Sequence, residues 1–199
     1  MRLGSPPWDA VTYWALDLET GGLDPRRDPI VAVGMVPIRA GVVRLGEAYQ
    51  TLVRPEAGQV IRPESVTAHQ LLGTEVAGAP PLAEVLREVD RRLREGVLLV
   101  HYQAIDVPFL RRGYARAGLR WPRPKVVDTV DLLVKADRRA RFTDPDRHPD
   151  GPPVQLGEAR RRHGLPDYQA HDPLTDAIAA AELFLVLRLA LKVRWLREL

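Results

Sequence analysis

Acidic and histidine residues stand in three short patches of this 199-residue chain. They are Asp17 and Glu19 in ALDLET, Asp106 in VHYQAIDVPFL, and His171 and Asp176 in HDPLTDAIAAAELF. Asp17 and Glu19 are two apart on an expected strand, so their carboxylates leave the same face. Crowded carboxylates repel one another, and Mg²⁺ or Mn²⁺ relieves that repulsion because hard oxygen ligands suit these ions. The ordered set therefore indicates a metal-dependent nuclease site.

Each patch taken alone has an ordinary explanation. An Asp-x-Glu pair at a strand end is most often solvated. Asp106 opens an expected helix, where the helix dipole favours any acid, and a lone loop histidine usually has no catalytic role. Asp106 also follows a strand, however, at the end where α/β folds place ligand groups. The prediction therefore rests on the combination.

The elements that must position these residues predict an α/β sandwich with a mixed sheet. We expect a meander of three strands over residues 11–18, 29–38 and 42–53, in which Pro37 frays the second strand. Two shorter strands are expected over residues 97–100 and 126–127. Asp128 should cap a helix that runs to about residue 136.

Helical periodicity and glycine stops predict further helices over residues 63–71, 81–95, 107–117, 154–163 and 174–196. Residues 143–153 form a loop without a periodic pattern. We expect a single domain over residues 1–199, with its core at about 11–190.

Composition narrows the class of protein. The absence of cysteine excludes disulfides, thiol catalysis and cysteine-bound zinc. The N-terminus lacks the apolar stretch of a signal peptide, and residues 183–191 are too short to span a bilayer, so we expect a cytoplasmic protein without a membrane partner. The net charge is +3, and 26 of the 29 basic residues are arginine, which suits phosphate binding. The arginine pairs in the helical segments are typical of solvated helix faces.

The three patches resemble the DnaQ-like 3′–5′ exonucleases whose general base is histidine, a family similar to the proofreading subunit of bacterial DNA polymerase III. ALDLETGGLDP matches that family's D-x-E-T-x-G-L pattern. HYQAIDVPFL resembles H-N-x-x-F-D-x-x-F-L, and HDPLTDAIAAAELF resembles H-x-A-x-x-D-A-x-A-x-A-x-L-F. The segment IRPESVTAHQL also looks like a family segment, and the resemblance runs from about residue 11 to 190.

The resemblance implies a ribonuclease-H-like fold, with a five-stranded mixed sheet flanked by helices. It also implies two Mg²⁺ or Mn²⁺ ions, about 3.5–4 Å apart, held by four carboxylates. These are Asp17, the expected bridge, with Glu19, Asp106 and Asp176. His171 would take a proton from the attacking water, and the product would be a nucleoside 5′-monophosphate. The implied substrate contacts are Thr20, Leu23, His69, His101 and Ile105.

The sequence departs from the family pattern at two positions near the site. Tyr102 stands where asparagine is common, and Ile105 where phenylalanine is common, which puts substrate specificity in doubt. A second register would use Tyr168, four residues before Asp172, as in the tyrosine subgroup. We disfavour it because the D-A-x-A-x-A-x-L-F helix begins at Asp176.

Three functions follow in order of preference. The first is an exonuclease acting on single-stranded DNA ends in proofreading or repair. Its expected partners are the DNA strand and a DNA polymerase. The second is a 3′ trimming exoribonuclease, since no residue that reads the 2′-hydroxyl can be recognised. The third is a non-catalytic polymerase-docking module, for which the basic end RLALKVRWLREL could serve as a surface. A degenerate module should lose an acid, whereas all four acids are present.

Overall fold

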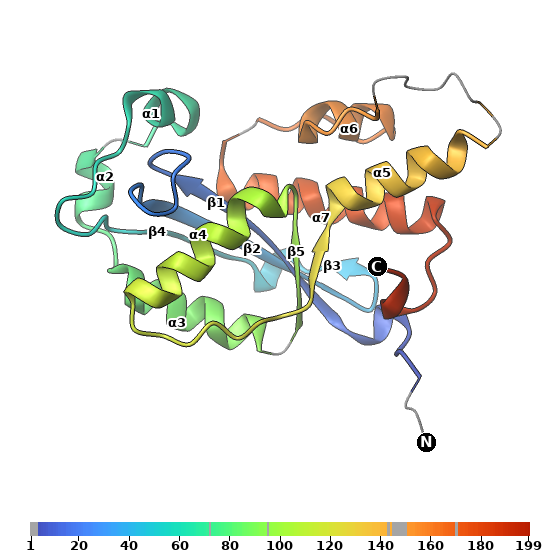
Figure 1. Cartoon of the computed structure of the whole chain (residues 1–199), viewed down its shortest axis with the longest axis horizontal. Helices are drawn as coiled ribbons and strands as arrows, with labels where there is room; N and C mark the ends of the chain where they lie inside the picture. The colour runs from blue at the N-terminus through green and yellow to red at the C-terminus, as the bar shows by residue number, and fades with distance from the viewer. Residues whose placement is uncertain (1–3, 72, 95, 143, 145–150, 170) are drawn as a thin grey trace.

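A single mixed sheet organises the computed structural model, which describes residues 4–71, 73–94, 96–142, 144, 151–169 and 171–199 (Figure 1). The strand order is β3-β2-β1-β5-β6, and β4 also pairs with β2. β1 and β2 are antiparallel, whereas β1, β5 and β6 run parallel. The strands are β1 (Thr12–Thr20), β2 (Ile30–Arg39), β3 (Val42–Val43), β4 (Tyr49–Leu52), β5 (Gly96–Val100) and β6 (Val126–Asp128).

Seven α-helices are described around this sheet. They are α1 (Pro63–His69), α2 (Gly73–Ala77), α3 (Leu82–Leu93), α4 (Gln103–Arg116), α5 (Thr129–Ala140), α6 (Leu156–Arg162) and α7 (Pro173–Ala190). Among the described helices, none combines the length and apolarity needed to cross a bilayer.

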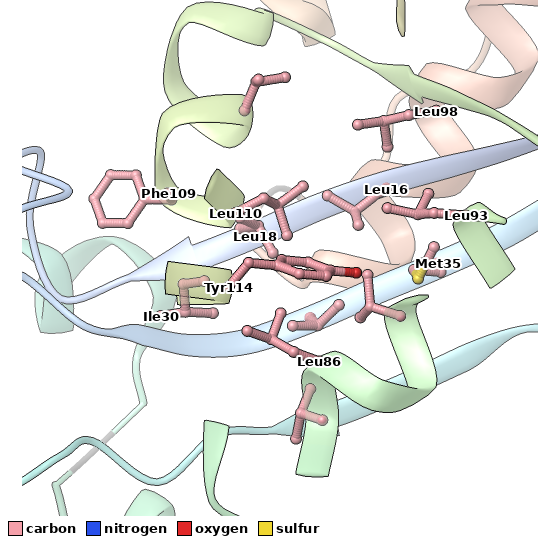
Figure 2. Packing of buried hydrophobic residues seen from close by; sticks show 14 of the residues in the cluster. Leu16, Leu18, Ile30, Met35, Leu86, Leu93, Leu98, Phe109, Leu110 and Tyr114 are labelled. Atoms are coloured by element: carbon pink, nitrogen blue, oxygen red, sulfur yellow. The ribbon is translucent and has the colours of Figure 1, made fainter. Parts of the chain in front are cut away.

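The alternation of side chains along β1 separates two cores. Leu16 and Leu18 point to one face, where Figure 2 shows them among Leu86 of α3 and Leu110 and Tyr114 of α4. The opposite face carries Tyr13 and Ala15, which pack with α5, α6 and α7. Residues 17 and 19 continue this second face, because successive strand residues alternate. Asp17 and Glu19 are therefore presented on the side of the sheet that α7 covers.

The predicted mixed α/β sheet flanked by helices is confirmed, but its strand count is six. The expected third strand is split into β3 and β4 by a 3-10 turn at Leu45–Glu47. The expected fraying at Pro37 was wrong, because β2 continues to Arg39. The Pro37 carbonyl accepts from the Arg44 N–H, and on this side Pro37 lies opposite the break between β3 and β4. No strand residue pairs with it there, so the N–H that proline lacks is not needed for the sheet.

Three helical expectations also change. Helix α4 begins at Gln103 rather than at residue 107, because the Asp128 carboxylate accepts from the N–H groups of Tyr102 and Gln103. Helix α2 was not predicted, since five residues are too few for a periodic signal. The closing helix ends at Ala190 rather than near 196, because Lys192 adopts a left-handed backbone with φ of 55°. The segment beyond it returns to the N-terminal residues, where Trp195 bridges to Pro7. Most of the expected 143–153 loop lies outside the described residues; residues 151–153 have no regular structure.

Candidate active site

Three elements bring the predicted acids together. Asp17 and Glu19 lie near the end of β1, Asp106 in the first turn of α4, and Asp176 in the first turn of α7. Ligand atoms of Glu19, Asp176 and His171 all lie within 4.8 Å of one another. The charges of Asp106 and Asp176 both act on Asp17. Residues from chain positions 17 to 176 thus form one acidic centre.

The electrostatics of this centre show the repulsion expected from the sequence. Burial, followed by the charges of Asp106, Asp176 and Glu19, raises the pKa of Asp17 well above its ordinary value. Burial and then the charge of Asp128 raise the pKa of Asp106. For Glu19, burial and the neighbouring Asp176 raise the pKa to about 7. Ionising carboxylates held this close is costly when no cation is bound, and their hard oxygen atoms fit Mg²⁺ or Mn²⁺.

Stability without metal should therefore fall as the pH rises. In the folded state Glu19 keeps a proton up to a pH of about 7, whereas the unfolded chain releases it near 4.5. The native state then binds more protons between these values, so the free energy of unfolding decreases across that window. The shift corresponds to about 3 kcal/mol for Glu19. Urea unfolding in chelator at pH 5 and pH 8 measures this loss.

The Glu19→Gln variant is the control for that measurement, because it removes the titrating group. Its free energy of unfolding should fall less between pH 5 and pH 8, and Mg²⁺ should restore the wild-type protein at pH 8 by binding the folded state. Identical pH dependence in wild type and Glu19→Gln would contradict the electrostatic assignment.

A glycine on β2 sets the position of α7 over the acids. Gly34 is the pairing partner of Asp17 in the β1–β2 ladder. A Cβ atom at Gly34 would lie 2.2 Å from the carbonyl of Pro173 and 2.3 Å from the backbone N of Leu174. The first turn of α7 therefore rests directly on the β2 backbone beside Asp17. A glycine inside a strand often marks a place where another backbone segment approaches closely, but the sequence did not indicate which segment approaches Gly34.

The start of α7 is also held by a cap. The Asp172 carboxylate accepts from the Thr175 N–H at 2.8 Å, which satisfies a free donor of the first turn. Its other oxygen accepts from Nε2 of Gln50 on β4 at 2.6 Å. Asp172 therefore ties the first turn of α7 to the sheet edge, a positioning role that the sequence did not predict.

Gly34→Ala should impair both stability and hydrolysis. The new methyl group meets backbone atoms that cannot rotate away, so α7 must shift, at a cost of about 1–3 kcal/mol. A displacement near 1 Å at the acids should lower turnover roughly a hundredfold. Gly46→Ala is the matched control, because nothing lies within 4 Å of its added Cβ. Thermal unfolding and turnover are the measurements, and equal behaviour of the two variants would contradict this role.

The structure brings His171, rather than Tyr168, to the acids. His171 adopts a left-handed backbone with φ of 69°, and its N–H donates to Oδ2 of Asp176 at 2.9 Å. The Tyr168 hydroxyl instead donates to Glu182 at 3.0 Å, and its ring faces the Arg160 guanidinium at 4.4 Å. Tyr168 is thus engaged with the middle of α7, away from its first turn.

The predicted substrate contacts fall into three groups. Leu23 and Ile105 are exposed, by 82% and 40%, and Thr20 donates from Oγ1 to the Gly22 carbonyl at 2.7 Å. Both ring nitrogens of His101 are engaged within the chain, with Thr129 Oγ1 at 2.6 Å and the Val154 carbonyl at 2.7 Å. Burial lowers the pKa of His101. The side chain of His69 lies outside the described part of the chain.

Asp128 holds the start of α4 as well as that of α5. It caps α5 as predicted, accepting from the Val130 N–H at 2.9 Å. It also accepts from the Tyr102 and Gln103 N–H groups, at 2.9 and 2.8 Å. The Tyr102 and Gln103 N–H groups stand at the start of α4, and Asp106 lies in its first turn. Asp128 therefore helps to position Asp106, a predicted metal ligand. The sequence indicated the cap but not this second role.

Replacing Tyr102 should stabilise the protein. Tyr102 has φ of 80°, a left-handed conformation that disfavours bulky side chains and that asparagine tolerates. Tyr102→Asn should raise the free energy of unfolding by about 1 kcal/mol, measured in urea. Tyr102→Ala removes the ring without favouring the left-handed backbone, and it should not stabilise the protein. A gain by alanine equal to that of asparagine would contradict the explanation.

Comparison with known proteins defines the class. The family model described as "Exonuclease" matches residues 14–184. The chain is 35% identical over 197 residues to a DNA polymerase III subunit epsilon-like protein of Rhodobacter capsulatus, covering 98% of this chain and 26% of that protein. It is 27% identical over 179 residues to a PolC-type DNA polymerase III of Thermotoga petrophila, covering 89% of this chain and 12% of that protein.

This chain belongs to the exonuclease family of DnaQ-like 3′–5′ exonucleases. It spans about a quarter or less of the length of these two relatives. Among solved structures, Escherichia coli Exonuclease I in complex with a dA16 oligonucleotide superposes with a TM-score of 0.76 at 17% identity, covering 90% of this chain and 41% of that chain. The likeness confirms the expected ribonuclease-H-like fold.

Proposed function

We propose that this protein is a metal-dependent 3′–5′ exonuclease that releases nucleoside 5′-monophosphates from single-stranded DNA ends, in proofreading or repair. The observation that carries the proposal is the meeting of Glu19, Asp176 and His171 within 4.8 Å, beside Asp17 and the buried Asp106, whose charges repel each other. A family member that had lost catalysis would be expected to lack one of these groups.

The acids are suited to hold two Mg²⁺ or Mn²⁺ ions. Asp17, Glu19, Asp106 and Asp176 are the proposed ligands, with Asp17 shared between the two. When bound, such ions stabilise the attacking and leaving oxygens of the phosphodiester. The raised pKa values of Asp17 and Glu19 give a physical reason for cation binding, since a cation lowers the cost of ionising them.

His171 is the proposed general base. Imidazole can accept a proton from water near neutral pH, and a side-chain base must reach that water. The His171 ring lies among the acidic ligands, and the hydrogen bond from its backbone N–H to Asp176 fixes the backbone from which the ring extends. The proton of the attacking water would pass to a ring nitrogen as the water oxygen bonds to phosphorus. The bond between phosphorus and the 3′-oxygen would break, and that oxygen would stay on the shortened strand and take a proton from solvent to become its new 3′-hydroxyl.

The terminal nucleotide would rest against the exposed Leu23 and Ile105, next to Thr20. His69 and His101 remain proposed contacts from the family resemblance. A contact from His101 requires its ring to exchange the Val154 carbonyl for substrate.

DNA is the proposed substrate because both similar proteins are named after DNA polymerase III and because the Exonuclease I structure holds a DNA oligonucleotide. A DNA polymerase is the corresponding proposed partner, and the cytoplasm the proposed location. Hydrolysis of matched DNA and RNA oligomers of one sequence tests the choice. We expect faster cleavage of DNA and no cleavage of either in chelator. A strong preference for RNA would favour 3′ trimming of RNA instead.

A further inference from the structure

We infer that an arginine-lined hollow beside the loop after β1 binds the phosphodiester backbone of the substrate strand, upstream of its terminal nucleotide. The hollow has a volume of about 570 Å³, and four arginines line it: Arg26, Arg27, Arg62 and Arg116. The inference rests on the proposed function, since it assigns a strand-binding surface to the same nuclease site.

The loop between β1 and β2 places the hollow next to the site. It leaves the acidic pair at Thr20, presents the exposed Leu23, and reaches Arg26 three residues later. A strand whose last nucleotide contacts Leu23 therefore has Arg26 and Arg27 within reach of its preceding phosphates. Figure 1 shows this loop between α1 and α4, at the tip of β1.

Internal contacts hold the loop in shape. The buried Asp28 carboxylate accepts from the Asp24 N–H at 2.8 Å and pairs with Nε of Arg62 at 3.0 Å. The Arg62 N–H donates to the Gly21 carbonyl at 2.8 Å. The Arg116 guanidinium of α4 donates to the Arg26 carbonyl. The loop backbone that carries Arg26 and Arg27 is thus fixed to the same scaffold as the acids, so it needs to gain little order on binding.

The charges of the loop arginines remain directed to solvent. Arg26 is exposed, and Arg27 meets Asp24 only at 3.7 Å with 82% of its side chain accessible, a weak pairing. Two other arginine clusters contain residues that are paired within the chain: Arg160 is buried against Glu182, and Arg92 pairs with Glu88.

A positively charged surface beside the acidic centre would attract the negatively charged strand. Without bound cations the acidic centre repels a polyanionic strand, so positive groups outside it favour binding of the strand. Arginine presents a planar fork that matches phosphate oxygens, and backbone contacts of this kind bind single strands without regard to sequence. The hollow supplies these groups next to the proposed position of the terminal nucleotide.

Binding of a fluorescent 20-nucleotide single-stranded DNA, measured by anisotropy in chelator across a range of salt, tests the inference. The variant is Arg26→Gln/Arg27→Gln, whose side chains are exposed and hold no buried partner. We expect its Kd to rise about tenfold at low salt, and the slope of log Kd against log salt to become shallower by about 0.7 per lost phosphate contact. Arg87→Gln on α3, an exposed arginine outside the hollow, is the control and should behave as wild type.

Hydrolysis separates this inference from the proposed function. With Mg²⁺, the double variant should keep wild-type turnover of the p-nitrophenyl ester of thymidine 5′-monophosphate, which carries one nucleotide and cannot reach the hollow, while its KM for the 20-mer rises. Unchanged Kd and salt slope in the double variant would overturn the inference even if the protein hydrolyses DNA. Weakened binding in a protein that hydrolyses neither substrate would support the arginine surface and reject the exonuclease proposal.

Discussion

Asp17→Asn should reduce hydrolysis at least a thousandfold while leaving the fold intact. Asp17 is the carboxylate on which the charges of Asp106, Asp176 and Glu19 all act, so it lies at the centre of the proposed ion site. Losing a shared ligand removes several kcal/mol of transition-state stabilisation. About 4 kcal/mol corresponds to a thousandfold in rate. Turnover of a 5′-labelled DNA oligomer in excess Mg²⁺ measures the effect.

The same substitution should raise stability in the absence of metal. Asparagine has the shape of aspartate without its charge, so the burial cost and the repulsion that raise the pKa of Asp17 disappear. The free energy of unfolding in chelator at pH 8 should therefore exceed that of wild type. Asp9→Asn, at an exposed position in the N-terminal turn, should change neither quantity appreciably. Substantial hydrolysis by Asp17→Asn in excess Mg²⁺ would show that the site is assigned wrongly.

His171→Ala should lower turnover by roughly a hundredfold to ten-thousandfold, the range that a positioned general base contributes. KM should change little, because the acids and the proposed nucleotide contacts remain. Steady-state rates with Mg²⁺ over a range of substrate concentrations measure both effects.

Tyr168→Phe is the matched comparison for the base assignment. It removes the hydroxyl that donates to Glu182 but keeps the ring that faces Arg160. Turnover should stay within about threefold of wild type, because the lost hydrogen bond goes to Glu182 in the middle of α7, away from the acids. A large loss in Tyr168→Phe together with an active His171→Ala would reverse the assignment and place the protein in the tyrosine subgroup.

Local sequence pattern was enough to predict how the acids are presented. Alternation along β1 put Asp17 and Glu19 on one face, and the structure sets that face towards α7. The cap at Asp128 and the start of α7 near Asp176 also followed from short-range preferences. These features depend on residues within one or two turns of each other, and such spacing is visible in a single sequence.

Features that depend on contacts between distant segments could not be predicted in this way. Nothing near Gly34 indicates that Pro173 rests on it. The bonds from Tyr102 and Gln103 to Asp128 join two strand ends that only the fold brings together. The arginine hollow likewise unites a loop, the approach to α1 and the end of α4. Residue types gave the candidates, whereas long-range packing decided which of them meet.

The direction and products of DNA cleavage test the central proposal most directly. A single-stranded oligomer labelled at its 3′-terminal nucleotide should release that label first, as a nucleoside 5′-monophosphate, when Mg²⁺ is added. The same oligomer labelled at its 5′ end should give a ladder that shortens one nucleotide at a time, and neither reaction should proceed in chelator. Internal cuts, release from the 5′ end, or undiminished cleavage in chelator would contradict a metal-dependent 3′–5′ exonuclease.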